Sequence, residues 1–213
     1  MNWLAHLLLS EADVESRLGN LLADIVKGTV REELNSNIQH GIKCHLVIDK
    51  FTDSHIVVQR SKDRINPSYR RFAGVLVDVF YDHYLAKNWS EYSHVSLDEF
   101  TAKIYKSFQA YQGEIPVTVT EMITRMAVED WLGAYRNVAG VENTLERISK
   151  RLSMRCLRRP SSFAVRGASR REVRATPLTP AVSELTTHYD AFEDDFQEFF
   201  PELISHVQNW CLV

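Results

Sequence analysis

The segment between Val75 and Ala86 constrains the fold more than any other part of the chain. Its Val, Leu, Phe, Tyr and Ala side chains are distributed so that nearly every face of a helical wheel carries an apolar group. A helix that is apolar all round is buried inside a larger structure. Because Asn66 and Pro67 form a helix start signal, we expect one long helix from residue 66 to about Trp89.

Two acids interrupt this apolar helix. Asp78 and Asp82 lie one turn apart in sequence, which places them about 40° apart around the helix axis. Burying an unpaired carboxylate costs several kcal/mol, so each acid needs a bound cation or hydrogen-bond donors. A structural ion network with Arg60, Arg70 or Arg71 is the alternative to a metal site, and the residues alone leave both open.

Helical periodicity recurs along the rest of the chain, whereas strand patterns hardly appear. We therefore expect an all-α fold and one domain over residues 1–213. Ser96 with Glu99, and Thr118 with Glu121, have the spacing of capping boxes, in which an N-cap hydroxyl is paired with an acid three residues later. The apolar stripes predict further helices over Gly19–Lys27, over about Val141–Leu152, and towards the C-terminus, where Pro201 is expected to break or kink the helix.

The stretch over residues 155–180 is the exception to this pattern. It contains seven arginines against one acid, together with three prolines, and it has almost no periodicity. Such a composition predicts a solvated loop or insertion before the C-terminal helices. Its arginines either attract an acidic partner protein or have no role, and the sequence does not decide between these.

Several side chains of metal-ligand type interrupt apolar helix faces in the first quarter of the chain. His6 and Asp24 each lie within a run of Leu, Ile and Val, and His45 and Asp49 continue a stripe of isoleucines. Side chains four residues apart on a helix have Cβ atoms roughly 5–6 Å apart, close enough to share a cation. The structural alternatives are a backbone hydrogen bond for His6 and a contact with a helix end for Asp24. Mixed His and carboxylate ligands favour manganese, iron or magnesium.

Composition excludes several classes of protein. The net charge of −3 argues against nucleic acid as the main partner. Cys44, Cys156 and Cys211 are widely spaced, which favours a reducing cytoplasm. No apolar run is long enough to span a membrane, and the N-terminal residues lack the features of a signal peptide.

In order along the chain, these residues resemble a known family. The matching blocks are Asn2-Trp-Leu-Ala-His6-Leu, Gly19-Asn-Leu-Leu-Ala-Asp24 with Lys27-Gly28, Gly41-Ile with His45 and Ile48-Asp49-Lys-Phe-Thr-Asp53-Ser-His55, Val77-Asp78 with Asp82-His83 and Trp89, and at the C-terminus His188-Tyr-Asp-Ala191 and Phe199-Phe-Pro201. They are similar to the acyl carrier protein phosphodiesterases, which are divergent members of the HD-domain metal phosphohydrolases. The resemblance implies a helical HD-domain-like fold and a manganese-dependent hydrolysis, with Mg²⁺ or Fe²⁺ as alternatives, that removes 4′-phosphopantetheine from the serine of holo-acyl carrier protein.

The resemblance also implies roles for individual residues. His6, Asp24 and one of Asp78 and Asp82, with Asp78 preferred, correspond to metal ligands; Ala23 stands where most HD proteins have a histidine. His45 and Asp49 are expected to orient the attacking water or to protonate the leaving serine oxygen. The residues expected to contact substrate are Lys50, Asp53, His55, Arg60 and His83, of which Lys50 or Arg60 would hold the phosphate.

Two other functions are compatible with the same residues. One is hydrolysis of a nucleotide or small phosphoester by an HD-type site, because a metal site alone does not identify the ester. The other is a non-catalytic helical binding protein whose polar intrusions are structural. The oligomeric state is not predicted by any feature of the sequence.

Overall fold

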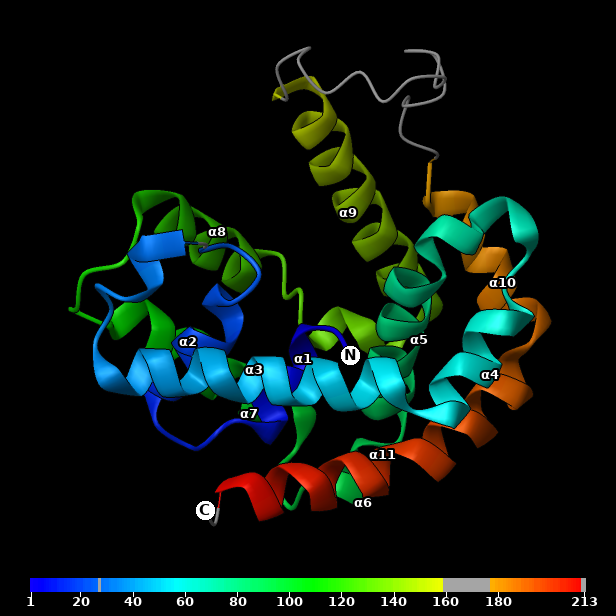
Figure 1. Ribbon diagram of the computed structural model, residues 1–213, viewed down its shortest axis with the longest axis horizontal. Helices are drawn as coiled ribbons and strands as arrows, with labels where there is room; N and C mark the ends of the chain where they lie inside the picture. Colours follow the sequence, from blue (N-terminus) through cyan, green and yellow to red (C-terminus); the bar gives the residue numbers. More distant parts are fainter. Residues whose placement is uncertain (27, 159–176, 212–213) are drawn as a thin grey trace.

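The computed structural model is built from helices (Figure 1). It describes residues 1–26, 28–158 and 177–211, and no strand occurs among them, so the expected all-α class is confirmed. The HD-type arrangement of the helices stays a prediction. The elements, in which η marks a short 3₁₀ helix, are α1 (Trp3–Leu9), α2 (Val14–Leu22), η1 (Gly28–Arg31), α3 (Ser36–Ser54), α4 (Ile56–Arg64), η2 (Pro67–Phe72), α5 (Ala73–Lys87), α6 (Trp89–Tyr92), α7 (Leu97–Ala110), α8 (Val117–Val128), η3 (Gly133–Arg136), α9 (Val138–Arg158), η4 (Thr179–Ala181), α10 (Val182–Thr187) and α11 (Tyr189–Cys211).

The apolar helix α5 is the centre of the core. It contacts α1, α4, α9, α11 and η3, and its side chains from Leu76 to Leu85 are almost all buried, except Asp78. Figure 1 shows α3 and α11 crossing the lower part of the molecule, while α9 projects upward from the end of α5. Burial of α5 on all sides is what its wheel predicted. The predicted single helix over residues 66–89 is wrong in detail, because η2 precedes α5 and the backbone of Phe72 leaves helical geometry between them.

Helices α2 and α3 make the most extensive contact in the fold, and glycines permit it. A Cβ atom on Gly19 would lie 2.0 Å from the carbonyl oxygen of Ile38, and one on Gly41 would lie 2.0 Å from that of Ser16. The two helix backbones therefore approach so closely that only glycine, which has no Cβ atom, fits at these two positions. This contact brings Asn20, which follows Gly19, next to His45, one turn beyond Gly41.

Other local expectations are partly corrected. Ser96 and Glu99 form the predicted capping box, but Thr118 and Glu121 do not, because α8 begins at Val117, so that Thr118 lies inside its first turn. The helix expected at Gly19–Lys27 instead covers Val14–Leu22, since the Asp13 side chain accepts a hydrogen bond from the Ser16 amide and starts it earlier. The chain then turns over residues 22–26.

The C-terminal part departs from the sequence pattern in two places. Helix α9 continues to Arg158, so the first residues of the predicted loop at 155–180 are helical, whereas residues 159–176 lie outside the described part. Helix α11 continues through Pro201, so the expected break does not occur, whereas a kink there stays a prediction. Within residues 1–26, 28–158 and 177–211, no helix has both the length and the apolar character needed to cross a lipid bilayer.

Candidate metal centre

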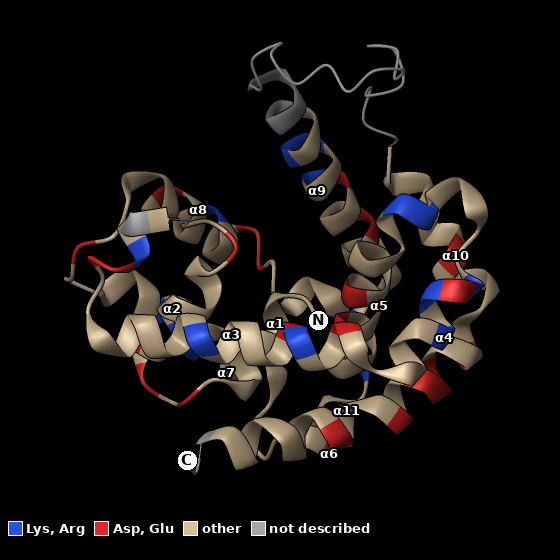
Figure 2. Cartoon of the chain, in the orientation of Figure 1, with Lys and Arg blue, Asp and Glu red and all other residues tan. Residues whose placement is uncertain are grey.

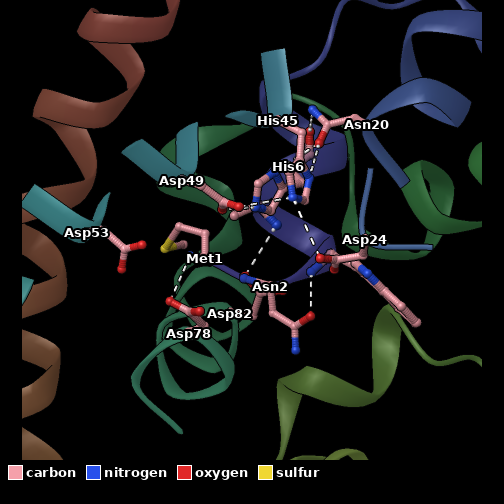
Figure 3. Close-up of polar contacts among 12 residues, drawn as sticks. Met1, Asn2, His6, Asn20, Asp24, His45, Asp49, Asp53, Asp78 and Asp82 are labelled. Atoms are coloured by element: carbon pink, nitrogen blue, oxygen red, sulfur yellow. Dashed lines mark hydrogen bonds and ion pairs between the residues drawn. The ribbon is translucent and has the colours of Figure 1, made fainter. Parts of the chain in front are cut away.

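Two histidines and one aspartate converge between α1 and α3 (Figure 3). His6 comes from α1, and His45 and Asp49 come from successive turns of α3. The Nε2 atom of His45 lies 3.0 Å from Asp49 Oδ2, and the Nε2 atom of His6 lies 3.3 Å from Asp49 Oδ1. Among the described residues, these three are the group whose ligand atoms lie within 4.8 Å of one another.

The opposite edges of the two imidazoles meet at Asn20 on α2. Its side-chain oxygen lies 2.9 Å from His6 Nδ1 and 3.1 Å from His45 Nδ1. The amide nitrogen of Asn20 donates to the carbonyl oxygen of His6 and to Ser10 Oγ, which fixes the orientation of the amide. The Asn20 oxygen, which can only accept, thus faces both Nδ1 atoms, an arrangement that suits a hydrogen on each of them.

The donor set of this cluster fits a divalent cation. Both histidines are buried, and His6 Nε2 has no hydrogen-bond partner. Burial holds the pKa of His6 below its usual value. Burial alone would raise the pKa of Asp49, but its contacts with His45 and His6 outweigh that effect and lower it. Two imidazole nitrogens aimed at an ionised carboxylate are a combination that Mn²⁺, Fe²⁺ or Mg²⁺ accepts.

A second carboxylate stands beside the cluster, just after the end of α2. Asp24 Oδ1 lies 3.8 Å from His45 Nε2. The side chains of Asp24 and Asp49 are 45% and 42% exposed, whereas those of His6 and His45 are nearly inaccessible. The cluster thus has a buried imidazole floor and a carboxylate edge that solvent reaches, so a ligand must approach from the carboxylate side.

Asp78 and Asp82, predicted as candidate ligands, contact the first residues of the chain instead of the imidazoles (Figure 3). Asp82 is fully buried, and its carboxylate accepts hydrogen bonds from the amides of Asn2 (3.2 Å), Leu4 (2.7 Å) and Ala5 (3.4 Å). Burial raises the pKa of Asp82 to about 7. Asp82 therefore holds the start of α1, the helix that carries His6.

Asp78 has a comparable place one turn earlier on α5. Its Oδ1 atom forms an ion pair with the amino group of Met1 at 2.8 Å. Neither acid belongs to the three-residue cluster that the described part contains. The assignment of one of them as a closing metal ligand stays a prediction, and the contacts observed give both another role.

The residues predicted to contact substrate are dispersed. Lys50 is exposed on α3 next to Asp49, which is compatible with a phosphate contact. Asp53 lies one turn further and pairs with Lys62 at 2.9 Å. His55 ends α3, accepts the amide hydrogen of Val57 as the N-cap of α4, and faces Glu202 at 3.2 Å.

Arg60 and His83 are occupied by partners within the chain. Arg60 pairs with buried Asp195 and with Glu198, and these contacts raise its pKa. Asp195 and Glu198 are two of several acidic residues along α11. Figure 2 shows these acids on α11, and it shows single, separated Lys and Arg residues on α3. His83 is buried between the carbonyl oxygen of Tyr135 (2.7 Å) and the hydroxyl of Tyr189 (2.8 Å). These contacts stabilise the packing of α4 and α5 on their neighbours.

Comparison with known proteins identifies the family. The model of the acyl carrier protein phosphodiesterase family matches residues 1–163, about three quarters of the chain. The chain belongs to this family. Every residue of the cluster, and Asn20 and Asp24 beside it, lies within the matched range.

Curated relatives extend the family match to nearly the full length. The chain is 29% identical over 210 residues to an acyl carrier protein phosphodiesterase from Enterobacter sp. (strain 638), with 98% of each chain covered. It is 27% identical to one from Photorhabdus laumondii, covering 100% of this chain and 99% of the relative. It is 29% identical to one from Escherichia coli, with 100% of each chain covered. No solved structure matches significantly.

Sequence reasoning missed Asn20 as a residue of the site. It lies in the block of the family pattern that begins at Gly19, inside an apolar stretch from Leu18 to Leu22, and it is completely buried. A buried amide in such a stretch needs several hydrogen-bond partners. That requirement was the available signal, but the sequence does not show that two histidines satisfy it.

Proposed function

We propose that this chain is a divalent-cation-dependent phosphodiesterase, with Mn²⁺ as the expected cation, that releases 4′-phosphopantetheine from the serine of holo-acyl carrier protein. The observation that supports the proposal is the convergence of His6, His45 and Asp49, because two imidazole nitrogens and a carboxylate within 4.8 Å of one another are a donor set suited to a divalent cation. Membership of the acyl carrier protein phosphodiesterase family supplies the substrate class. We place the reaction in the cytoplasm, which the spacing of the cysteines favours.

The proposed ligands are His6 Nε2, His45 Nε2 and Asp49, with Asp24 at the exposed edge of the same site. A divalent cation held there supplies Lewis-acid stabilisation of the charge that develops on the phosphoryl oxygens. Asp24, which is close to His45 but makes no other ion pair among the described residues, is positioned to accept a proton from the attacking water. Lys50, exposed one residue after Asp49, is placed to contact the phosphate.

The exposed edge of the site suits a substrate carried on a protein. Asp24 and Asp49 are both more than 40% exposed, so a serine on the surface of a carrier protein can reach them without entering a deep cavity. Two cavities of about 680 and 570 Å³ in the described part lie elsewhere, on either side of the loop at residues 111–116. Neither is lined by a residue of the cluster.

The direct test is a mass measurement on the carrier protein. Purified protein is incubated with Mn²⁺ and holo-acyl carrier protein, and we expect the carrier to lose the mass of phosphopantetheine. A chelator or His45→Ala should abolish the loss, whereas His40→Ala, on the same helix but outside the cluster, should retain it. Turnover of a nucleotide panel without action on the carrier would identify a nucleotide phosphohydrolase. Absence of any metal uptake would favour a non-catalytic binding protein.

A further inference from the structure

The side chain of Asn20 makes more hydrogen bonds within the site than the side chain of any proposed ligand. Its side chain is completely buried in α2, and the oxygen and the nitrogen each have two partners. The nitrogen donates to the carbonyl oxygen of His6 at 3.1 Å and to Ser10 Oγ at 2.7 Å. Ser10 Oγ in turn donates to the same His6 carbonyl oxygen at 2.7 Å. A rotated amide would place its oxygen against the carbonyl oxygen of His6, which can only accept a hydrogen bond, so this network admits one orientation.

The two histidines need a specific tautomer to act as ligands. An imidazole binds a cation through a nitrogen that carries no hydrogen, and the other nitrogen then carries one. Here Nε2 faces Asp49 in both rings, so Nδ1 must carry the hydrogen when a cation is present. Each buried Nδ1–H then requires an acceptor, because a buried donor without a partner is costly.

Asp49 competes with Asn20 for the one hydrogen that each neutral imidazole carries. In the absence of a cation its carboxylate lies 3.0 Å from His45 Nε2 and 3.3 Å from His6 Nε2, and a negative charge there favours a hydrogen on Nε2, which is the tautomer that does not bind metal. The Asn20 oxygen is the acceptor on the other edge of both rings. It therefore favours a hydrogen on Nδ1 of each ring, whereas Asp49 favours a hydrogen on Nε2.

We propose that Asn20 is a positioning residue that holds His6 and His45 together in the tautomer that binds the cation. The proposal rests on the cation site of the proposed function, but not on the identity of the substrate. A single oxygen shared by two Nδ1–H groups also accounts for the parallel arrangement of the rings, whose centroids are 4.1 Å apart. Asn20 thus couples the two imidazole ligands, although it touches neither the cation nor the substrate.

Three variants separate the acceptor from the packing of the site. Asn20→Leu removes the acceptor and both donor contacts while keeping a similar volume. Asn20→Asp keeps an acceptor for both Nδ1–H groups but loses the donors to His6 and Ser10. Ser10→Ala removes one partner of the Asn20 nitrogen and leaves the acceptor unchanged, so it serves as the matched control.

The measurement is Mn²⁺ affinity of the purified full-length variants, by calorimetry or by electron paramagnetic resonance of free Mn²⁺. Loss of a residue that orients a ligand histidine typically weakens metal binding about 10- to 100-fold, and we expect this for Asn20→Leu. Asn20→Asp should recover most of the affinity, and Ser10→Ala should stay close to wild type. In Zn²⁺-loaded protein labelled with ¹⁵N-histidine, His6 and His45 should show hydrogen on Nδ1 only, and the Nδ1–H signals should shift in Asn20→Asp. Thermal unfolding of each metal-free variant checks that it is folded.

The outcomes distinguish failure of this inference from failure of the proposed function. Unchanged Mn²⁺ affinity in folded Asn20→Leu, with affinity lost in His6→Ala and His45→Ala, would overturn the role of Asn20 and keep the site. Unchanged affinity in the two histidine variants would overturn the site and this inference together. A weakened Asn20→Leu, rescued by Asn20→Asp, would support the inference even if holo-acyl carrier protein were not hydrolysed.

Discussion

The imidazole rings of His6 and His45 lie face to face, with their centroids 4.1 Å apart and their planes 22° apart. They come from different helices, α1 and α3, and they are both buried. Two imidazolium ions in this arrangement would repel each other, whereas two neutral rings with Nε2 directed to one side can bind a shared cation. This pair is the structural centre of the candidate site.

Mn²⁺ should stabilise the wild-type protein and fail to stabilise His45→Ala. A ligand that binds only the folded state adds about 2.7 kcal/mol to the free energy of unfolding at a concentration 100 times its dissociation constant. Thermal unfolding with and without Mn²⁺ measures this effect. His40→Ala is the control, since His40 is on α3 but stacks on Trp210, and it should keep the Mn²⁺-dependent shift. An equal shift in both variants would remove His45 from the ligand set.

Asp24→Ala should lose activity on holo-acyl carrier protein with little change in stability. The side chain is 45% exposed, so its removal should change the free energy of unfolding by about 0.5 kcal/mol or less. Loss of a group that takes a proton in the reaction costs about 10²- to 10⁴-fold in rate. Steady-state kinetics and urea unfolding give the two quantities. Asp63→Ala, which removes an exposed acid paired with Arg70, is the comparison and should keep activity, and full activity of Asp24→Ala would contradict the assignment.

Gly41→Ala should destabilise the protein by about 1–3 kcal/mol or more, because the added methyl group would meet the Ser16 carbonyl oxygen at 2.0 Å. Helices α2 and α3 would have to separate, which would also move Asn20 away from His45. Gly74→Ala is a matched control on α5, where the nearest atom to the new Cβ is Lys62 Cε at 3.6 Å. Since alanine favours a helix over glycine, that variant should be neutral or stabilised by up to about 1 kcal/mol. Urea unfolding of both variants tests the difference.

Asp82 should make stability depend on pH between about 4 and 7. Its pKa in the folded protein is about 7, above the value of about 3.9 for an unfolded aspartate. In this window the folded state keeps a proton that the unfolded state has lost, so the Asp82 contribution to the free energy of unfolding falls as pH rises. The slope is at most about 1.4 kcal/mol per pH unit.

Comparison with Asp82→Asn isolates this contribution from those of other acids. The difference in the free energy of unfolding between wild type and Asp82→Asn should decrease from pH 4 to pH 7 and then level off. Chemical denaturation across that range measures it. A difference that rises with pH would show that the Met1 amino group and the amides of Leu4, Ala5 and Asn2 together lower the pKa of Asp82 more than burial raises it.

The sequence by itself determined the helical class and the set of polar residues from which a site could be built. Its 3.6-residue periodicity predicted most of the helices. His6, His45 and Asp49, which the fold brings together, were all among the expected site residues, but the expected ligands were His6, Asp24 and Asp78 or Asp82, with His45 and Asp49 in catalytic roles. Such residues can be found in a sequence because a polar side chain on a buried face must find a partner, wherever that partner comes from.

Only the tertiary structure decided which partner each polar residue finds. On the wheel of α5, Asp78 and Asp82 are as suitable for a cation as Asp49 is on α3, but the first residues of the chain lie against α5 and supply N–H donors to both acids. Asn20 reaches the histidines because Gly19 and Gly41 allow two backbones to touch. Periodicity fixes the face on which a side chain lies, whereas the group opposite that face depends on packing between helices that are distant in sequence.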